Sequence, residues 1–176
     1  MIFYHGSVKP RDKWDFKPSG DREQYGPGWC FSTSEDEARI YAQGPDGMLY
    51  RCEIDVSNMG PNEGSVRKHA AKLKKLIRSA PNFSSFIVTW AENESVAVKE
   101  ALETTIEYAS GLHDAIQQVW VDFYRHDGAD WADNVQKIFG WSLAAQDPED
   151  VDSDKSIVVW DSSIITILDT SKAVPS

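Results

Sequence analysis

The segment that decides the fold and the site is Phe3-Tyr4-His5-Gly6-Ser7. Residues 1–4 are apolar and aromatic, which is typical of a short β-strand. His5 and Gly6 then lie at the end of this strand. A histidine followed by glycine is an unusual pair to build there for structure alone, so we expect the two residues to line a site.

A second stretch gives this pair a context: Tyr25-Gly26-Pro27-Gly28-Trp29-Cys30-Phe31-Ser32-Thr33-Ser34. Residues 28–32 are expected to form another strand. The Gly-Pro-Gly turn before it lets the backbone approach a ligand closely, because glycine has no side chain. Tyr25, Trp29 and Tyr41 offer flat faces for a base or a pyridine ring. On these features alone, an ordinary turn and an ordinary core tyrosine are the simpler interpretation.

The next segments predict a helix and a strand. Ser34-Glu35-Asp36-Glu37 has the pattern of a capping box, with serine at the N-cap and glutamate three residues on. The helix continues through residues 38–42 and ends at Gly44-Pro45. Residues 48–56 alternate between apolar and mostly polar positions, with Leu49 among the polar ones, and predict a half-buried strand.

The centre of the chain is expected to be helical and its end to return to strands. Apolar spacing predicts helices within 66–78, 98–109 and 112–123, and a fourth within 130–140, capped by Asp130 and closed by Gly140. Strands are expected at 141–145, at 156–160 and, as the neighbour of the latter, at 164–168, with a frayed tail after Thr170. This order indicates an α+β fold in a single domain, residues 1–176, with a helical segment at about 63–140.

The composition of the chain disfavours several classes of function. The formal charge of −10 makes nucleic acid an unfavourable partner. No apolar run is long enough to span a bilayer and no signal-peptide pattern is present, so we expect a cytoplasmic protein. Cys30 and Cys52 are expected to be free and buried, and the spacing of the histidines predicts no metal site.

Three motifs in order resemble the ADP-ribosyltransferase superfamily of the diphtheria-toxin and PARP type. They are Tyr4-His5-Gly6-Ser7, then Gly26-Pro27-Gly28-Trp29-Cys30-Phe31-Ser32, then Ala38-Arg39-Ile40-Tyr41-Ala42. The chain looks closest to small bacterial and phage members, including polyvalent-protein domains. The segment Ser156-Ile157-Val158-Val159-Trp160-Asp161 matches the strand that carries the third catalytic residue of the family.

The resemblance implies a split β-sheet with NAD, the substrate, folded into its cleft. His5 would hydrogen-bond the adenine-side ribose, and the backbone of Gly6 would hold the nicotinamide amide. Ser7 would line the same pocket, and Tyr41 would stack on the nicotinamide ring. The remaining residues expected at the pocket are Tyr25, Gly28, Cys30 and Ser32.

The sequence departs from the family at two motif positions. Cys30 stands where the second motif has tyrosine, and Ser156 stands where the third has glutamate. In active relatives that carboxylate binds a ribose hydroxyl and stabilises the oxocarbenium-like state as nicotinamide leaves. Asp154, or Asp152 beside it, is expected to supply a substitute carboxylate; a solvated acidic loop is the alternative. Members without the glutamate can also transfer one ADP-ribose by using the carboxylate of the acceptor.

The expected function is therefore mono-ADP-ribosyl transfer from NAD to a macromolecular target, a protein, with His5, Asp154 and Ser156 at the catalytic site. A phage-type effector or counter-defence role fits the resemblance. Two alternatives stay open: a binding module for NAD or ADP-ribose without catalysis, and an acidic protein-interaction or inhibitor protein. A basic helix face at 67–78 fits either target docking or a solvated surface.

Overall fold

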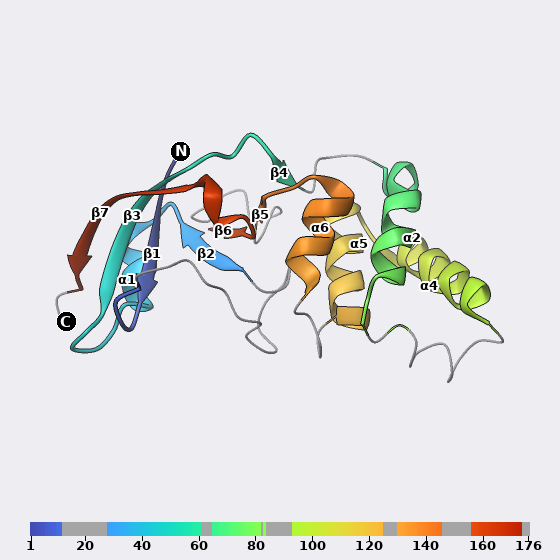
Figure 1. Cartoon of the computed structure of the whole chain (residues 1–176), viewed down its shortest axis with the longest axis horizontal. Coiled ribbons are helices and arrows are strands. Elements are labelled where there is room, and N and C mark those ends of the chain that lie inside the picture. Colours follow the sequence, from blue (N-terminus) through green and yellow to red (C-terminus); the bar gives the residue numbers. More distant parts are fainter. Residues whose placement is uncertain are drawn as a thin grey trace. The chain divides into compact units, whose positions relative to one another are not determined.

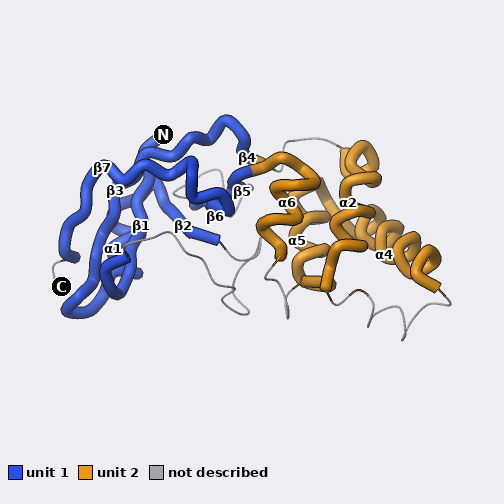
Figure 2. The backbone as a smooth tube through the Cα atoms, in the orientation of Figure 1, with its two compact units in different colours: residues 1–16, 28–59, 142–176 blue, residues 17–27, 60–141 orange. Residues whose placement is uncertain are grey.

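A computed structural model describes residues 1–11, 28–60, 65–81, 83, 93–124, 130–145 and 156–173 of the chain (Figure 1). The chain divides into two compact units (Figure 2). Unit 1 comprises residues 1–16, 28–59 and 142–176, and unit 2 comprises 17–27 and 60–141. Strands form most of the first and helices the second, so the α+β prediction is confirmed.

Unit 1 is built on a β-sheet whose strand order is β4-β5-β6-β2-β1-β3-β7. The strands are β1 (Ile2–Ser7), β2 (Trp29–Ser32), β3 (Met48–Ile54), β5 (Leu143–Ala145), β6 (Ser156–Val159) and β7 (Ile165–Lys172), with the two-residue β4 (Met59–Gly60) at the boundary between the units. A short helix, α1 (Glu35–Ile40), packs on β1 and β2.

Strand β1 pairs with its two neighbouring strands over very different lengths. On one side β1 aligns with β3 over six residue pairs, from Ile2↔Glu53 to Ser7↔Met48. On the other side the register with β2 consists of one pair, Tyr4↔Ser32. Strand β2 in turn aligns with β6 over its full length. The ladder between β1 and β2 therefore ends at Tyr4, and His5 follows at once.

The core of unit 1 explains why these segments are strands. Alternating apolar residues of several strands bury their side chains in one cluster: Phe3, Trp29, Phe31, Tyr50, Cys52, Ile54, Leu143, Ile157 and Val159. This alternation is the period expected of a sheet with one buried face. Leu49, which the sequence places on the polar side of its strand, is also buried.

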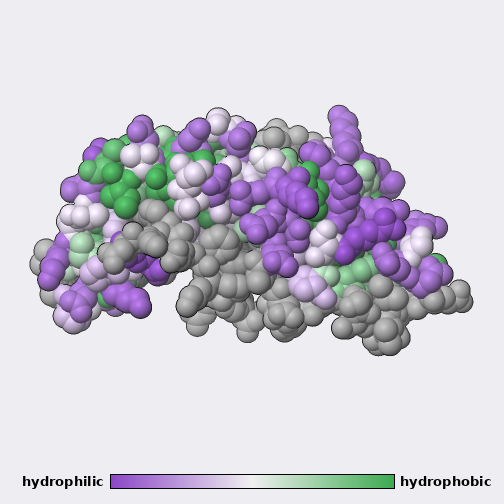
Figure 3. All heavy atoms as spheres, in the orientation of Figure 1, coloured by the Kyte–Doolittle hydropathy of each residue, from purple (hydrophilic) through white to green (hydrophobic). Residues whose placement is uncertain are grey.

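The C-terminal strand differs from its prediction in partner and in length. Strand β7 pairs with β3, whereas β6 lies between β2 and β5. A 3-10 turn, η4 (Ser162–Ile164), separates β6 from β7. The strand runs to Lys172 opposite Met48, so the fraying predicted after Thr170 is wrong for Ser171 and Lys172, and residues 174–176 lie outside the described residues. Ile167 and Leu168 are exposed on β7, where Figure 3 shows hydrophobic atoms at the surface of unit 1.

Unit 2 contains the expected helices. They are η1 (Val66–His69), α2 (Ala70–Arg78), α4 (Glu94–Tyr108), α5 (Leu112–Val119), the π-helical turn η2 (Trp120–Tyr124) and α6 (Trp131–Phe139). Helix α6 ends at Gly140 in the left-handed conformation (φ 80°), as glycine at this position predicts. Asp130 stands at the predicted N-cap position of α6, but its side chain makes no capping hydrogen bond there.

Candidate functional site

His5 lies where the β1–β2 ladder ends, and its side chain links the two strands. The imidazole Nδ1 is 2.8 Å from the carbonyl oxygen of Cys30. Because a carbonyl can only accept, Nδ1 carries the hydrogen in this contact. The ring is enclosed by three aromatic side chains, with centroid distances of 5.6 Å to Trp29, 5.4 Å to Phe31 and 6.1 Å to Tyr50.

This environment favours the neutral imidazole. Burial among the aromatic rings and, to a smaller extent, the positive charge of Arg11 lower the pKa of His5 to about 4, against the raising effect of the hydrogen bond to Cys30. At neutral pH His5 is therefore an uncharged hydrogen-bonding group. A neutral imidazole suits recognition of a hydroxyl, which can both donate and accept.

The lowered pKa predicts acid sensitivity. The unfolded chain takes up a proton at His5 below its ordinary pKa of 6.5, whereas the folded chain resists this until about pH 4. The corresponding stability is present above pH 6.5 and is lost as the pH falls through this window. Between pH 7 and 4.5 we expect the wild type to lose on the order of 2 kcal/mol more than His5→Gln in urea unfolding. Equal losses would contradict the buried, neutral assignment.

Arg11 adds a fixed positive charge beside this histidine. Its guanidinium carbon lies 4.5 Å from the centroid of the Trp29 ring, and its Nε donates to Ser7 Oγ at 2.9 Å. The backbone N–H of Arg11 donates to the hydroxyl of Tyr50 at 2.7 Å. Ser7 Oγ in turn donates to the carbonyl of Lys9 at 2.8 Å. These contacts fix the chain after β1 and keep the Arg11 guanidinium close to His5.

Gly6 is required by the packing of helix α1 on β1. A Cβ atom added there would lie 1.8 Å from the carbonyl oxygen of Ala38 and 3.0 Å from the backbone nitrogen of Ala42. Gly28 has a similar role toward β6, since its Cβ would lie 2.8 Å from the carbonyl oxygen of Val159. Both glycines allow close backbone approach, and the neighbour they approach is another part of unit 1.

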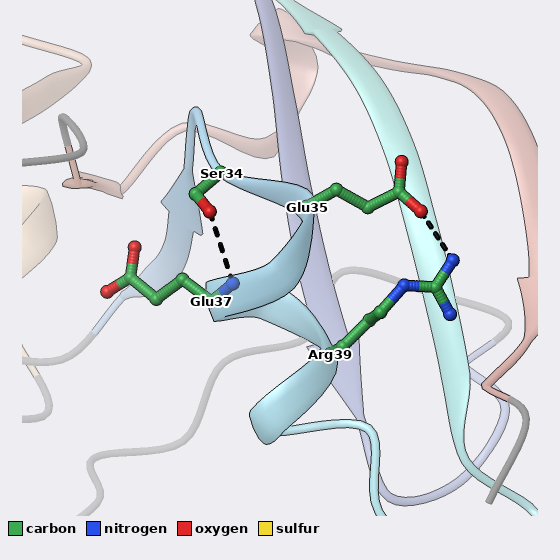
Figure 4. A network of polar contacts seen from close by, with 4 residues as sticks. All are labelled: Ser34, Glu35, Glu37 and Arg39. Atoms are coloured by element: carbon green, nitrogen blue, oxygen red, sulfur yellow. Dashed lines mark hydrogen bonds and ion pairs between the residues drawn. The ribbon is translucent and has the colours of Figure 1, made fainter. Parts of the chain in front are cut away.

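At the start of α1, one of the two hydrogen bonds of a capping box forms. Ser34 Oγ accepts from the backbone N–H of Glu37 at 3.2 Å, as predicted. The reciprocal bond, from the Ser34 N–H to the Glu37 carboxylate, is replaced. That N–H donates to Ser32 Oγ at 3.0 Å. The Glu37 side chain is directed elsewhere, to the side of α1 opposite to Glu35 and Arg39 (Figure 4).

The Glu37 carboxylate lies over the neighbouring ends of β2 and β6. Ser32 Oγ donates a hydrogen bond to Glu37 Oε2. Ser156 Oγ lies 3.5 Å from each of the two carboxylate oxygens. Ser32 and Ser156 face each other in the β2–β6 register. Two hydroxyls on adjacent strands and one carboxylate from the helix therefore form a compact polar cluster, which we call the Glu37 cluster.

Because side chains alternate along a strand, the aromatic residues around His5 and the Glu37 cluster lie on different sides of β2. Trp29 and Phe31, which touch His5, alternate with Cys30 and Ser32, and Ser32 belongs to the Glu37 cluster. The backbone of Cys30 lies between these two groups of side chains, and its carbonyl oxygen binds Nδ1 of His5. A ligand that touched both groups would have to pass the point where β1 and β2 cease to pair.

The structure brings some predicted site residues together and separates others. His5, Ser7 and Cys30 lie at the end of the β1–β2 ladder, and Ser32 and Ser156 lie in the Glu37 cluster. Tyr41 is the C-cap residue of α1 and is 64% exposed. Tyr25 and the two candidate aspartates, Asp152 and Asp154, lie outside the described residues.

Cysteine exposure corrects one expectation. Neither Cys30 nor Cys52 is in a disulfide, but Cys30 is exposed and only Cys52 is buried. The reason is the alternation in β2, which turns Cys30 away from the core that holds Trp29 and Phe31. Burial raises the pKa of the Cys52 thiol to about 12, so this thiol is an inert core group.

Two candidate functional residues were not predicted from the sequence. The sequence places Glu37 in a capping box, and Arg11 belongs to none of the three motifs. Ser32 and Ser156 could have pointed to Glu37, because two hydroxyls that face each other on adjacent strands can bind a carboxylate. The sequence alone does not show that these two strands pair.

Comparison with protein-family models, curated proteins and solved structures yields no match for this chain. Within the described ranges, no group of three or more His, Cys, Asp and Glu side chains could hold a metal ion. None of the helices in those ranges has the length and apolar character needed to cross a bilayer.

Proposed function

We propose that this protein is a mono-ADP-ribosyltransferase with an ADP-ribosyltransferase-like split sheet, acting on NAD and a protein target. The observation that carries the proposal is the position of His5. It follows directly on the last β1–β2 pair, Tyr4↔Ser32, and hydrogen-bonds across to Cys30. A sheet that opens at this histidine is the arrangement expected for a split sheet with a dinucleotide lying across the opening.

The side chains around this opening suit the parts of NAD. The neutral imidazole of His5 can hydrogen-bond a ribose hydroxyl. Arg11 provides the guanidinium that a diphosphate prefers, because its donors match the phosphate oxygens. Tyr41, exposed at the end of α1, offers an aromatic face to a planar ring.

The reaction exchanges one bond at the nicotinamide-side ribose for another. The bond between ribose C1′ and the nicotinamide nitrogen breaks, and its electron pair neutralises the pyridinium as nicotinamide leaves. The ribose carries an oxocarbenium-like charge until a nucleophile of the acceptor forms a new bond to C1′ and releases its proton. Residues of this chain contribute by holding NAD and by placing negative charge near that cation.

The proposal predicts that NAD binds and that binding depends on His5. By calorimetry, we expect NAD to bind the wild type and His5→Gln to bind at least about tenfold more weakly, which corresponds to loss of one good polar contact. His69→Gln in unit 2 is the matched control and should bind as the wild type does. Absence of NAD binding by the folded wild type would contradict the proposal.

A further inference from the structure

The resemblance leaves a chemical gap, because Ser156 stands where its third motif has a carboxylate. We infer that Glu37 fills this gap and is the catalytic carboxylate of the site. The inference rests on the proposed function and names the residue that the strand position itself does not supply. It assigns to helix α1 a role that the family resemblance gives to β6.

The position of the Glu37 carboxylate supports this assignment. The Glu37 oxygens lie 3.5 Å from Ser156 Oγ, so the carboxylate occupies the space next to the side chain at position 156. Ser156 is opposite Ser32 in the ladder, and Ser32 also binds Glu37. A carboxylate delivered from α1 thus reaches the place that a longer acidic side chain on β6 would reach.

The Glu37 side chain also does not make the hydrogen bond that a capping box would give it. In a complete capping box this side chain would accept the N–H of the N-cap residue. Here the Ser34 N–H donates to Ser32 Oγ instead, and Glu37 accepts from Ser32. The carboxylate is therefore bound to the sheet, and the helix N-terminus is satisfied without it.

The orientation of the Glu37 carboxylate is also fixed. Hydroxyls of Ser32 and Ser156 contact the Glu37 carboxylate, which restricts its rotamers. A charge fixed before the reaction stabilises a developing cation more than a mobile one, because no reorganisation is needed during the reaction. Glu35 on the same helix is half-buried and pairs with Arg39, and its side chain points the other way (Figure 4).

In the inferred step Glu37 stays unmodified. Its carboxylate accepts a hydrogen bond from a hydroxyl of the nicotinamide-side ribose and stabilises the positive charge as the C1′–nitrogen bond breaks. Nicotinamide leaves with the bonding electron pair. The acceptor, a target nucleophile or water, closes the new bond to C1′ and gives its proton to solvent.

The test measures nicotinamide release from NAD, with water as acceptor, together with NAD affinity by calorimetry. We expect Glu37→Gln to lower kcat at least about 100-fold, the size typical of removing one electrostatic contact to a transition state. Its NAD affinity and melting temperature should stay close to those of the wild type. Glu35→Gln, the matched control on the same helix, should retain wild-type turnover.

A transplanted carboxylate makes the test specific. The double variant Glu37→Ser with Ser156→Glu moves the acidic group from the helix to the strand while keeping a hydroxyl at the other position. We expect it to recover at least tenfold over Glu37→Gln. A merely structural role for Glu37 would not predict this rescue, because the helix would still lack its acidic side chain.

The outcomes separate the inference from the function on which it rests. Wild-type turnover with unchanged turnover in Glu37→Gln overturns the inference alone, as does loss of activity in Asp154→Asn but not in Glu37→Gln. NAD binding without any nicotinamide release overturns the inference and leaves a binding site for NAD. Failure of the wild type to bind NAD overturns both.

Discussion

Gly6→Ala is expected to destabilise the protein by at least about 3 kcal/mol and to abolish NAD cleavage. The added Cβ would lie 1.8 Å from the carbonyl oxygen of Ala38 and 2.9 Å from its carbonyl carbon. Both are backbone atoms, so no side-chain rotation relieves the overlap. Either α1 must move away from β1 or the strand must bend, and each change destroys packing that the native state needs.

Urea unfolding and nicotinamide release together test this expectation. Val8→Ala is the control, because Val8 is exposed just beyond β1 and its truncation should change stability by less than about 0.5 kcal/mol. Displacement of α1 would also carry Glu37 away from Ser32, which is why activity should fall with stability. Wild-type stability in Gly6→Ala would show that α1 does not pack on β1 as described.

Trp131→Ala is expected to remove about 3–5 kcal/mol from the stability of unit 2, as for other large aromatic truncations in a core. Trp131 is completely buried in α6. Its ring centroid lies 4.9 Å from that of Tyr124 and 5.3 Å from that of Trp120. Truncation would leave a cavity bordered by two aromatic rings that themselves anchor the turn after α5.

Loss of helical circular dichroism in urea measures this effect. Tyr124 also donates its hydroxyl to the carbonyl of Leu76 at 2.7 Å, so a shift of its ring would affect α2 as well. Tyr108→Ala removes an exposed aromatic from α4 and should cost less than about 0.5 kcal/mol. A cost below about 1 kcal/mol for Trp131→Ala would contradict the packing described for unit 2.

Local patterns predicted the elements of this protein well. The serine at position 34 caps α1, and Gly140 ends α6 with a positive φ, because both roles depend on a few neighbouring residues. Likewise, alternation from Met48 onward predicted β3, which ends at Ile54 and not at residue 56 as predicted. The exception is Leu49, which is buried although it lies on the side of the strand with charged neighbours.

Pairing between distant segments could not be predicted in the same way. Strand β7 has eight residues of mixed polarity and lies at the sheet edge against β3, a choice that depends on the whole topology. The same limit applies to the candidate site. His5 and Ser156 were identified by motif, whereas Glu37 gains its place only through the pairing of Ser32 with Ser156.

We propose that ligand binding and bond cleavage depend on different side chains of this protein. His5 and Arg11 lie on the aromatic side of β2, where the β1–β2 ladder ends. The Glu37 cluster lies on the side that faces α1. An NAD molecule that spans the opening would present its adenine-side ribose to the first group and its nicotinamide-side ribose to the second.

The most direct test of this account is a titration of the histidine-labelled protein with NAD, followed by NMR of the imidazole resonances. The chain has four histidines; of the three in the described ranges, His5 lies in unit 1 and His69 and His113 lie in unit 2. We expect the His5 ring signals to shift saturably with NAD while those of His69 and His113 remain in place. Unchanged His5 signals at saturating NAD would contradict the claim that this histidine marks the NAD site.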